Sequence, residues 1–92
     1  MLRFTFSKQV DMACVEDTLV LAVLAAESIH GRTDIRLDAC FRLQPGTCSI
    51  DDGTPVGRTI ARVFTGYLAR EFGEGAFTIV RVAAGNTESE AA

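Results

Sequence analysis

The feature that most restricts the fold of this chain is an uninterrupted apolar run inside a predicted helix. Residues Leu19 to Ala26 are all Leu, Val or Ala, and the surrounding pattern predicts a helix from about Met12 to Ile29. Asp11 is its expected N-cap, and Gly31 follows where a left-handed residue ends a helix. Because the run covers the whole circumference, a sheet can cover one side of the helix, and the rest requires a second helix or another subunit.

Composition and length predict one small ordered domain. The chain has 92 residues, of which 48% are hydrophobic and 23% charged, a normal balance for a globular protein. A domain of this size has a thin core and often gains stability by oligomerising. We expect residues 1–84 to form this domain and residues 85–92 to form a disordered acidic tail. The apolar run is far shorter than the roughly 20 residues of a membrane span, so no membrane contact is expected.

Alternating apolar residues and turn signals predict four strands, and helical spacing after Thr54 and Pro55 predicts a second helix. The strands are expected at Leu2–Phe6, Thr33–Leu43, Thr47–Asp51 and Ala76–Val82, and the helix at Pro55–Phe72. A Pro45-Gly46 turn makes a hairpin of the second and third strands. Apolar residues on both faces of the last strand predict a central position, or cover on both sides.

This β-α-β-β-α-β order predicts an α+β fold. With right-handed crossovers, both helices cover one face of a four-stranded antiparallel sheet, and the simplest such two-layer sandwich is the ferredoxin-like arrangement. The strand Thr33–Leu43 then lies at a sheet edge and carries charges of alternating sign on its outer face. These charges can discourage edge pairing. They can instead complement a two-fold copy, with Asp38 of one chain beside Arg36 of the other.

The segment after the hairpin is a candidate anion site. The amides that follow Gly53, together with Thr54 and Arg58, can bind an anion at the start of the helix. Arg62 lies one turn beyond Arg58, so the two guanidinium groups can clamp one anion. The alternative, which the local pattern favours, is a turn followed by a helix cap.

Other candidates for chemistry have simpler interpretations. Cys14, Cys40 and Cys48 are odd in number and do not form a disulfide framework, which indicates a reducing compartment. Burial as small apolar residues explains each cysteine better than catalysis or metal binding does. His30 is the only histidine, and its place at the end of a helix explains it without a catalytic role. We expect no metal and no cofactor.

The net charge of −3 has the wrong sign for a general nucleic-acid binder. The strands also offer none of the stacked aromatic residues that an RNA-reading sheet uses. We therefore expect a cytoplasmic, homodimeric domain that works by binding a protein partner or a small acid. Its oligomer interface is predicted at Val20, Leu24, Arg36 and Asp38.

Two alternatives stay open. One is a small dimeric ferredoxin-like enzyme that acts on a small acidic substrate in a pocket between helices and sheet. Its first candidate residues are His30, Asp51, Asp52 and Arg58. The two aspartates are neighbours whose side chains diverge in an extended segment, so they are not a pair sharing one proton. The other alternative is an inhibitor or regulator that docks on a larger protein by strand addition or through its helical face.

Overall fold

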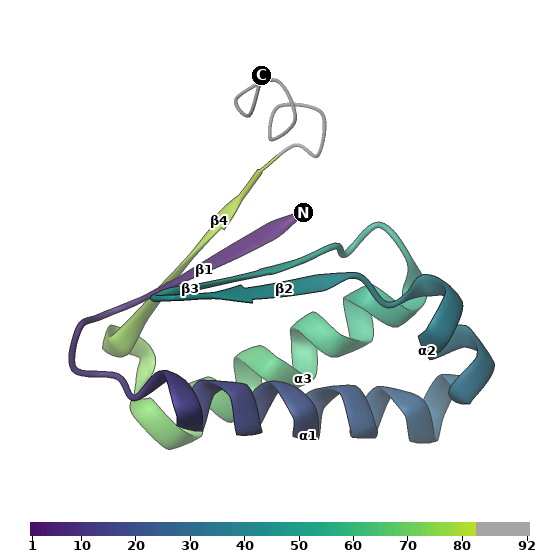
Figure 1. The fold of residues 1–92 in the computed structure, drawn as a ribbon, viewed down its shortest axis with the longest axis horizontal. Helices are drawn as coiled ribbons and strands as arrows, with labels where there is room; N and C mark the ends of the chain where they lie inside the picture. The colour runs from purple at the N-terminus through teal and green to yellow at the C-terminus, as the bar shows by residue number, and fades with distance from the viewer. Residues whose placement is uncertain (83–92) are drawn as a thin grey trace.

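The sheet and the helices form two layers (Figure 1). This computed structural model describes residues 1–82. The four strands are all antiparallel to their neighbours and follow the order β2-β3-β1-β4. The elements are β1 (Leu2–Phe6), α1 (Met12–His30), α2 (Arg32–Asp38), β2 (Phe41–Gln44), β3 (Thr47–Ile50), α3 (Pro55–Phe72), the 3₁₀ turn η1 (Glu74–Ala76) and β4 (Phe77–Arg81). The predicted α+β class with a four-stranded antiparallel sheet is confirmed.

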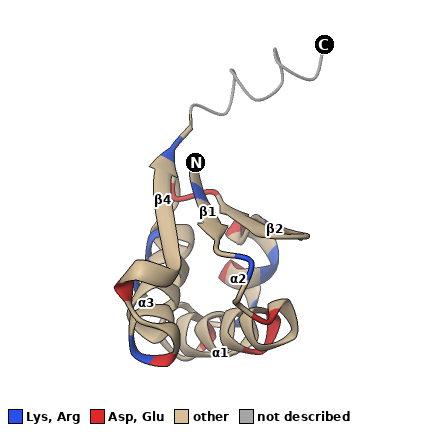
Figure 2. Ribbon diagram, turned by 90° about the vertical axis from the view of Figure 1, so that its left-hand side faces the viewer, with Lys and Arg blue, Asp and Glu red and all other residues tan. Residues whose placement is uncertain are grey.

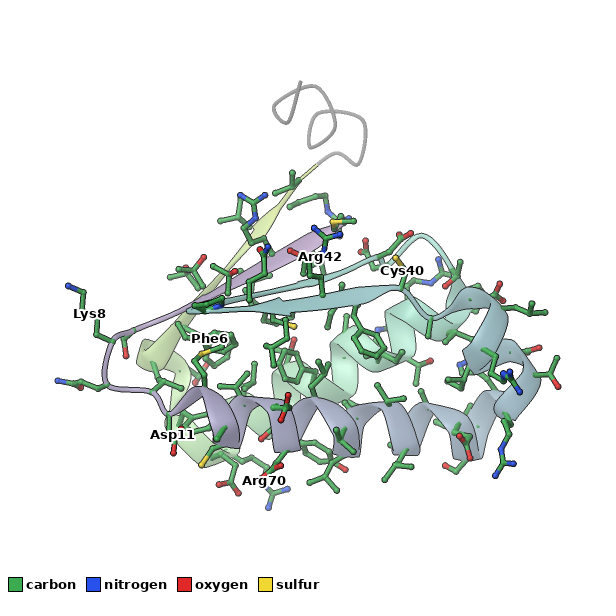
Figure 3. All side chains as sticks on the ribbon, viewed as in Figure 1. Phe6, Lys8, Asp11, Cys40, Arg42 and Arg70 are labelled. Carbon is green, nitrogen blue, oxygen red and sulfur yellow. The ribbon has the colours of Figure 1, made fainter. Side chains whose placement is uncertain are left out.

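The core lies between the sheet and the two long helices. Phe4 and Phe6 point from the central strand β1 toward the ring of Phe64 on α3, with centroid distances of 5.0 and 6.5 Å in edge-to-face geometry. Phe64 and Phe4 are fully buried. Figure 3 shows Phe6 on the helix side of the sheet. The aromatic contacts therefore fix the face of the sheet on which α3 lies.

Both long helices begin and end where the sequence predicts. The carboxylate of Asp11 accepts a hydrogen bond from the N–H of Ala13, and the hydroxyl of Thr54 accepts one from the N–H of Gly57. These side chains satisfy backbone donors that a helix start leaves free. Gly31 and Gly73 end the helices with φ angles of 89° and 87°, a region that favours glycine.

The predicted strand Thr33–Leu43 is wrong over its first half, because residues 32–38 form the helix α2. The pairing of β2 with β3 places Phe41 opposite Ile50, and the Asp51 N–H still bonds to the carbonyl of Cys40. Extending the strand further back would require a partner beyond Asp51, where the chain turns into α3. The earlier residues have no strand to pair with, so they form helical hydrogen bonds instead.

The predicted central position of the last strand is also wrong. Strand β4 pairs with β1 on one side and is an edge of the sheet. Its Val80 is 54% exposed on the face away from the helices, opposite Arg3 of β1. The apolar residues on both faces of β4 are therefore not evidence that other elements cover both faces.

The hairpin turns at Pro45 and Gly46, as the sequence predicts, with Gln44 opposite Thr47. Leu43 pairs with Cys48 on the helix side, and Gly46 has a φ angle of 76° in the turn. No helix within residues 1–82 is both long and apolar enough to cross a bilayer. The tail predicted at 85–92 lies outside the described residues, so its prediction stays open.

Candidate interaction surface

Helix α1 presents three different faces to its surroundings. Its core face consists of small or medium side chains, Val15, Leu19, Ala22 and Ala26, which are all buried. A second face turns toward α3, and a third turns toward the edge strand β2. Because each face repeats at the spacing of three or four residues, the whole apolar run is divided among all three.

The third face borders an apolar groove between α1 and β2, which we call the α1–β2 groove. It has a volume of about 350 Å³. Helix α1 lines it with a stripe at successive turns, and β2 adds the two side chains that point to the helix side of the sheet. The lining residues are Glu16, Leu19, Val20, Val23, Leu24, Phe41 and Leu43.

Three apolar side chains of this groove stay open to solvent. Val20 is 52% exposed, Leu24 54% and Phe41 42%. They adjoin one another across the groove, so they form one contiguous patch and are not isolated surface residues. Patches of this kind on a folded domain mark interaction surfaces.

The groove on the other side of α1 has a different character. It lies between α1 and α3 and has a volume of about 540 Å³. Asp17, Arg70 and Glu71 line it together with Tyr67, and Figure 3 shows Arg70 below the helices, away from the sheet. The α1–β2 groove has one charged residue, Glu16. Of these two grooves, the α1–β2 groove is therefore the one from which water is removed at the lower cost of charge desolvation.

The structure divides the four predicted interface residues into two groups. Val20 and Leu24 lie together in the α1–β2 groove. Arg36 and Asp38 are exposed on α2 and not on an edge strand, which corrects the geometry in which a cross-strand pair was predicted. The backbone carbonyl of Asp38 accepts a hydrogen bond of 3.3 Å from the hydroxyl of Thr54, which ties the end of α2 to the start of α3.

The predicted anion corner contains amides that already have partners. The N–H of Gly53 donates to the carboxylate of Asp51 at 2.9 Å, and the N–H of Gly57 donates to the hydroxyl of Thr54 at 3.0 Å. Arg58 and Arg62 are exposed on the outer side of α3. An anion at this corner would compete with the Asp51 carboxylate, so the anion site stays a prediction.

The candidate catalytic residues have structural contacts in different places. Nε2 of His30 lies 2.7 Å from Oγ1 of Thr59, and this contact joins the end of α1 to the first turns of α3. Thr59 donates its hydroxyl proton to the carbonyl of Pro55, which leaves Nε2 of His30 as the donor to Thr59. Asp52 forms a salt bridge with Arg81 at 2.9 Å and with the N-terminal amine of Met1 at 3.4 Å. These contacts account for the side chains without catalysis, and the enzyme hypothesis stays a prediction.

The Asp52 contacts join three parts of the chain. Asp52, in the loop before α3, contacts the start of β1 through Met1 and the end of β4 through Arg81, and Figure 2 shows an acidic segment of the chain beside these two strands. The hydrogen bond from Arg81 lowers the pKa of Asp52 below its ordinary value, and the amine of Met1 acts in the same direction. Burial opposes this shift. Asp52 is therefore held as a carboxylate at neutral pH.

Of the three cysteines, Cys48 is buried as predicted, whereas Cys14 and Cys40 are exposed. The thiols of Cys48 and Cys14 are held in their protonated form. Burial raises the pKa of Cys48 to about 12. The negative charge of Asp11 raises the pKa of the exposed Cys14, whose sulfur lies 3.8 Å from the Asp11 carboxylate. Since the thiolate is the nucleophile, neither environment favours covalent catalysis. Within residues 1–82, no group of three or more His, Cys, Asp or Glu side chains could hold a metal ion.

Comparison with protein-family models, with curated proteins and with solved structures gives no match for this chain. The candidate surface is therefore defined by its physical properties. The sequence prediction missed Phe41 and Glu16 as members of this surface. The signal for Phe41 was present, because the hairpin strand was expected at a sheet edge. Glu16 could have been found from its position one turn before Val20 on the same helical stripe.

Proposed function

We propose that this chain is a small interaction domain that associates with a second copy of itself through the α1–β2 groove. The observation that carries the proposal is the distribution of side-chain size on α1. After Val15 and Leu19, the helix buries only the small residues Ala22 and Ala26 among its apolar side chains, and it exposes Val20, Leu21 and Leu24. A monomer gains nothing from this arrangement, because burial of Leu or Val contributes more stability than burial of Ala.

The strand order and the crossovers support a ferredoxin-like assignment, which we include in the proposal. The order β2-β3-β1-β4 with antiparallel neighbours is compatible with this arrangement, and α2 is then an insertion before β2. Free cysteines at three positions support a reducing compartment such as the cytoplasm. Neither feature replaces the α1–β2 groove as the basis of the functional proposal.

Light scattering of purified protein over a range of micromolar concentrations tests self-association. We expect a dimer, and Leu24→Glu should weaken it at least about tenfold, which corresponds to roughly 1.4 kcal/mol. The reason is that a carboxylate in the groove would lose its water without gaining a partner.

Leu21→Glu is the matched control, because Leu21 lies on the same helix and is 55% exposed, close to the 54% of Leu24. It borders the other groove, so dimerisation should be unchanged. A monomer at all concentrations would contradict the proposal. Equal weakening by both substitutions would show that general hydrophobicity of α1, and not the α1–β2 groove, drives association.

A further inference from the structure

The structure carries a more specific inference about how two copies join. We propose that β2 pairs with β2 of a second copy in antiparallel orientation, with Phe41 of each copy at the two-fold axis. This inference rests on the proposed function and adds the strand and its register. The two sheets would become one continuous sheet, with both α1 helices on the same face.

The pattern of backbone bonds shows which groups of β2 are free. The Asp51 N–H donates to the Cys40 carbonyl at 2.8 Å, so these two residues form a hydrogen-bonded pair. In an antiparallel ladder such pairs alternate with pairs that are not hydrogen-bonded. Arg42 therefore bonds toward β3, and the N–H and C=O groups of Phe41 and Leu43 point to the free edge. Among the strands of residues 1–82, none covers this edge.

A two-fold axis can lie at Arg42, Leu43 or Phe41, and the structure separates these registers. An axis at Arg42 places two guanidinium groups directly opposite each other, which is unfavourable. An axis at Leu43 places Phe41 opposite Pro45 of the other copy, and proline has no N–H to donate. It also brings the two Glu16 carboxylates together, because Glu16 and Leu43 line the same depression.

The register centred on Phe41 separates the two Arg42 side chains and the two Glu16 carboxylates. It places Leu43 opposite Ala39, whose N–H already donates to the Ile35 carbonyl, so it loses one ladder bond just as the Leu43 register does at Pro45. The separation of the Glu16 carboxylates therefore favours the Phe41 register.

In this register, Arg42 lies opposite Cys40 of the second copy, and the two Phe41 rings meet on the helix side, where Leu24 lines the same groove. The two-fold axis makes α1 antiparallel to α1 of the second copy. The exposed apolar residues of both helices then pack against one another, at the 8–10 Å spacing usual for packed helices.

Charge complementarity supports a second copy of this chain as the partner that occupies the α1–β2 groove. Glu16 lies eight residues before Leu24, about 12 Å along α1. When the two α1 helices cross near Leu24, Glu16 reaches the other helix near its C-terminal end. There α2 of the second copy begins with the exposed Arg32, and further along it carries Arg36 between Asp34 and Asp38. Eight residues beyond Leu24 is Arg32, so the single acid of the groove faces Arg32 of the second copy, a charge pair that an unrelated apolar segment does not provide.

Disulfide cross-linking tests the register. In a Cys14→Ser background, Cys40 is the remaining exposed thiol, because Cys48 is buried. Arg42→Cys in this background places a new thiol opposite Cys40 of the second copy. Residues in a pair that is not hydrogen-bonded have Cα atoms about 4.5 Å apart, within disulfide range. Mild oxidation should convert most of the protein to a dimer that reducing agent returns to monomer.

Two control variants make the result specific. Cys14→Ser alone should give no cross-link, because Cys40 does not face itself. Adding Cys40→Ser to the Arg42→Cys protein should abolish the cross-link. A cross-link that survives this addition would place Arg42 opposite Arg42 and overturn the register.

Light scattering of the same samples separates the two proposals. A dimer that gives no cross-link in any variant would overturn β2 pairing and leave self-association through the groove intact. A monomer would overturn both. Since Arg42 is exposed on the face of the sheet away from the helices (Figure 3), its substitution leaves the core unchanged, and thermal unfolding under reducing conditions checks this.

Discussion

Helices α1 and α3 cover the same face of the sheet and have nearly equal lengths of 19 and 18 residues. They nevertheless use their apolar side chains differently. Helix α3 buries its large residues at Val56, Ile60, Phe64 and Leu68, one turn apart, and Tyr67 is the single large apolar residue of residues 55–72 that reaches 36% exposure. Helix α1 exposes four large apolar side chains, Val20, Leu21, Leu24 and Ile29.

The comparison separates the apolar side chains that the core requires from those that it does not. The pattern of α3 is that of an amphipathic helix whose hydrophobic content matches the area it buries. Helix α1 carries hydrophobic residues in addition to those that contact the core. Such residues lower solubility unless another surface covers them. In the proposed dimer, the apolar run Leu19 to Ala26 therefore serves two interfaces, one inside the domain and one between the two copies.

The strongest test of this comparison substitutes one large residue on each helix. Phe64→Ala removes a fully buried ring that contacts Phe4 and Phe6, and it should lower the free energy of unfolding by about 3–5 kcal/mol. Leu24→Ala removes a half-exposed side chain and should cost less than about 1 kcal/mol in the monomer. Urea unfolding at several protein concentrations measures both. Equal losses at the lowest concentration would show that α1 and α3 do not differ in this way.

A second test concerns a close contact that α3 has and α1 lacks. A Cβ atom at Gly57 would collide with the backbone carbonyl of Asp51, and it would also lie 3.2 Å from the Thr54 hydroxyl. Gly57→Ala should therefore destabilise the protein by about 1–3 kcal/mol, although alanine favours helix.

Gly66→Ala is the control in the same helix, because nothing lies within 4 Å of its added Cβ. It should stabilise the protein by about 0.5–1 kcal/mol. Thermal unfolding compares the two variants. If Gly57→Ala also stabilises the protein, the approach of the Asp51 loop to α3 is looser than the structure shows.

Much of this fold could be predicted because local chemistry decides it. Thr54 and Pro55 start α3, and Gly31 and Gly73 end the two long helices, through contacts within a few residues. The start of β2 could not be predicted in the same way. Alternation at Ile35, Leu37 and Ala39 fits a strand, but strand formation also requires a partner, and the length of β3 limits that partner.

The candidate surface was predictable in part for a similar reason. The apolar circumference of α1 predicted that something must cover it, and Val20 and Leu24 followed from that prediction. Which elements border the exposed part depends on the sheet order, which places β2 and Phe41 beside this face. Glu16 and Phe41 were therefore identified as members of the groove from the tertiary structure, and not from helical periodicity.

The smallest expected effect distinguishes the acids that precede the two helices. Asp11 caps α1 and contacts Cys14, whereas Asp52 precedes α3 and binds Arg81 and the amine of Met1. The pKa of Asp52 is lowered in the folded state, chiefly by the hydrogen bond from Arg81. Its contribution to stability is therefore present above the pKa of an unfolded aspartate, near 3.9, and is lost as the pH falls through the lower folded value.

Asp52→Asn removes this acid-dependent contribution. The loss at pH 7 should stay below about 1 kcal/mol, because Arg81 is exposed and solvent screens the pair. Between pH 5 and pH 2, wild-type protein should lose more stability than the variant, so their unfolding midpoints should converge. Added salt should bring the midpoints closer at pH 7, because it screens the same pair. Parallel curves for the two proteins across this pH range would show that the Asp52 contacts do not hold the start of α3 to the ends of β1 and β4.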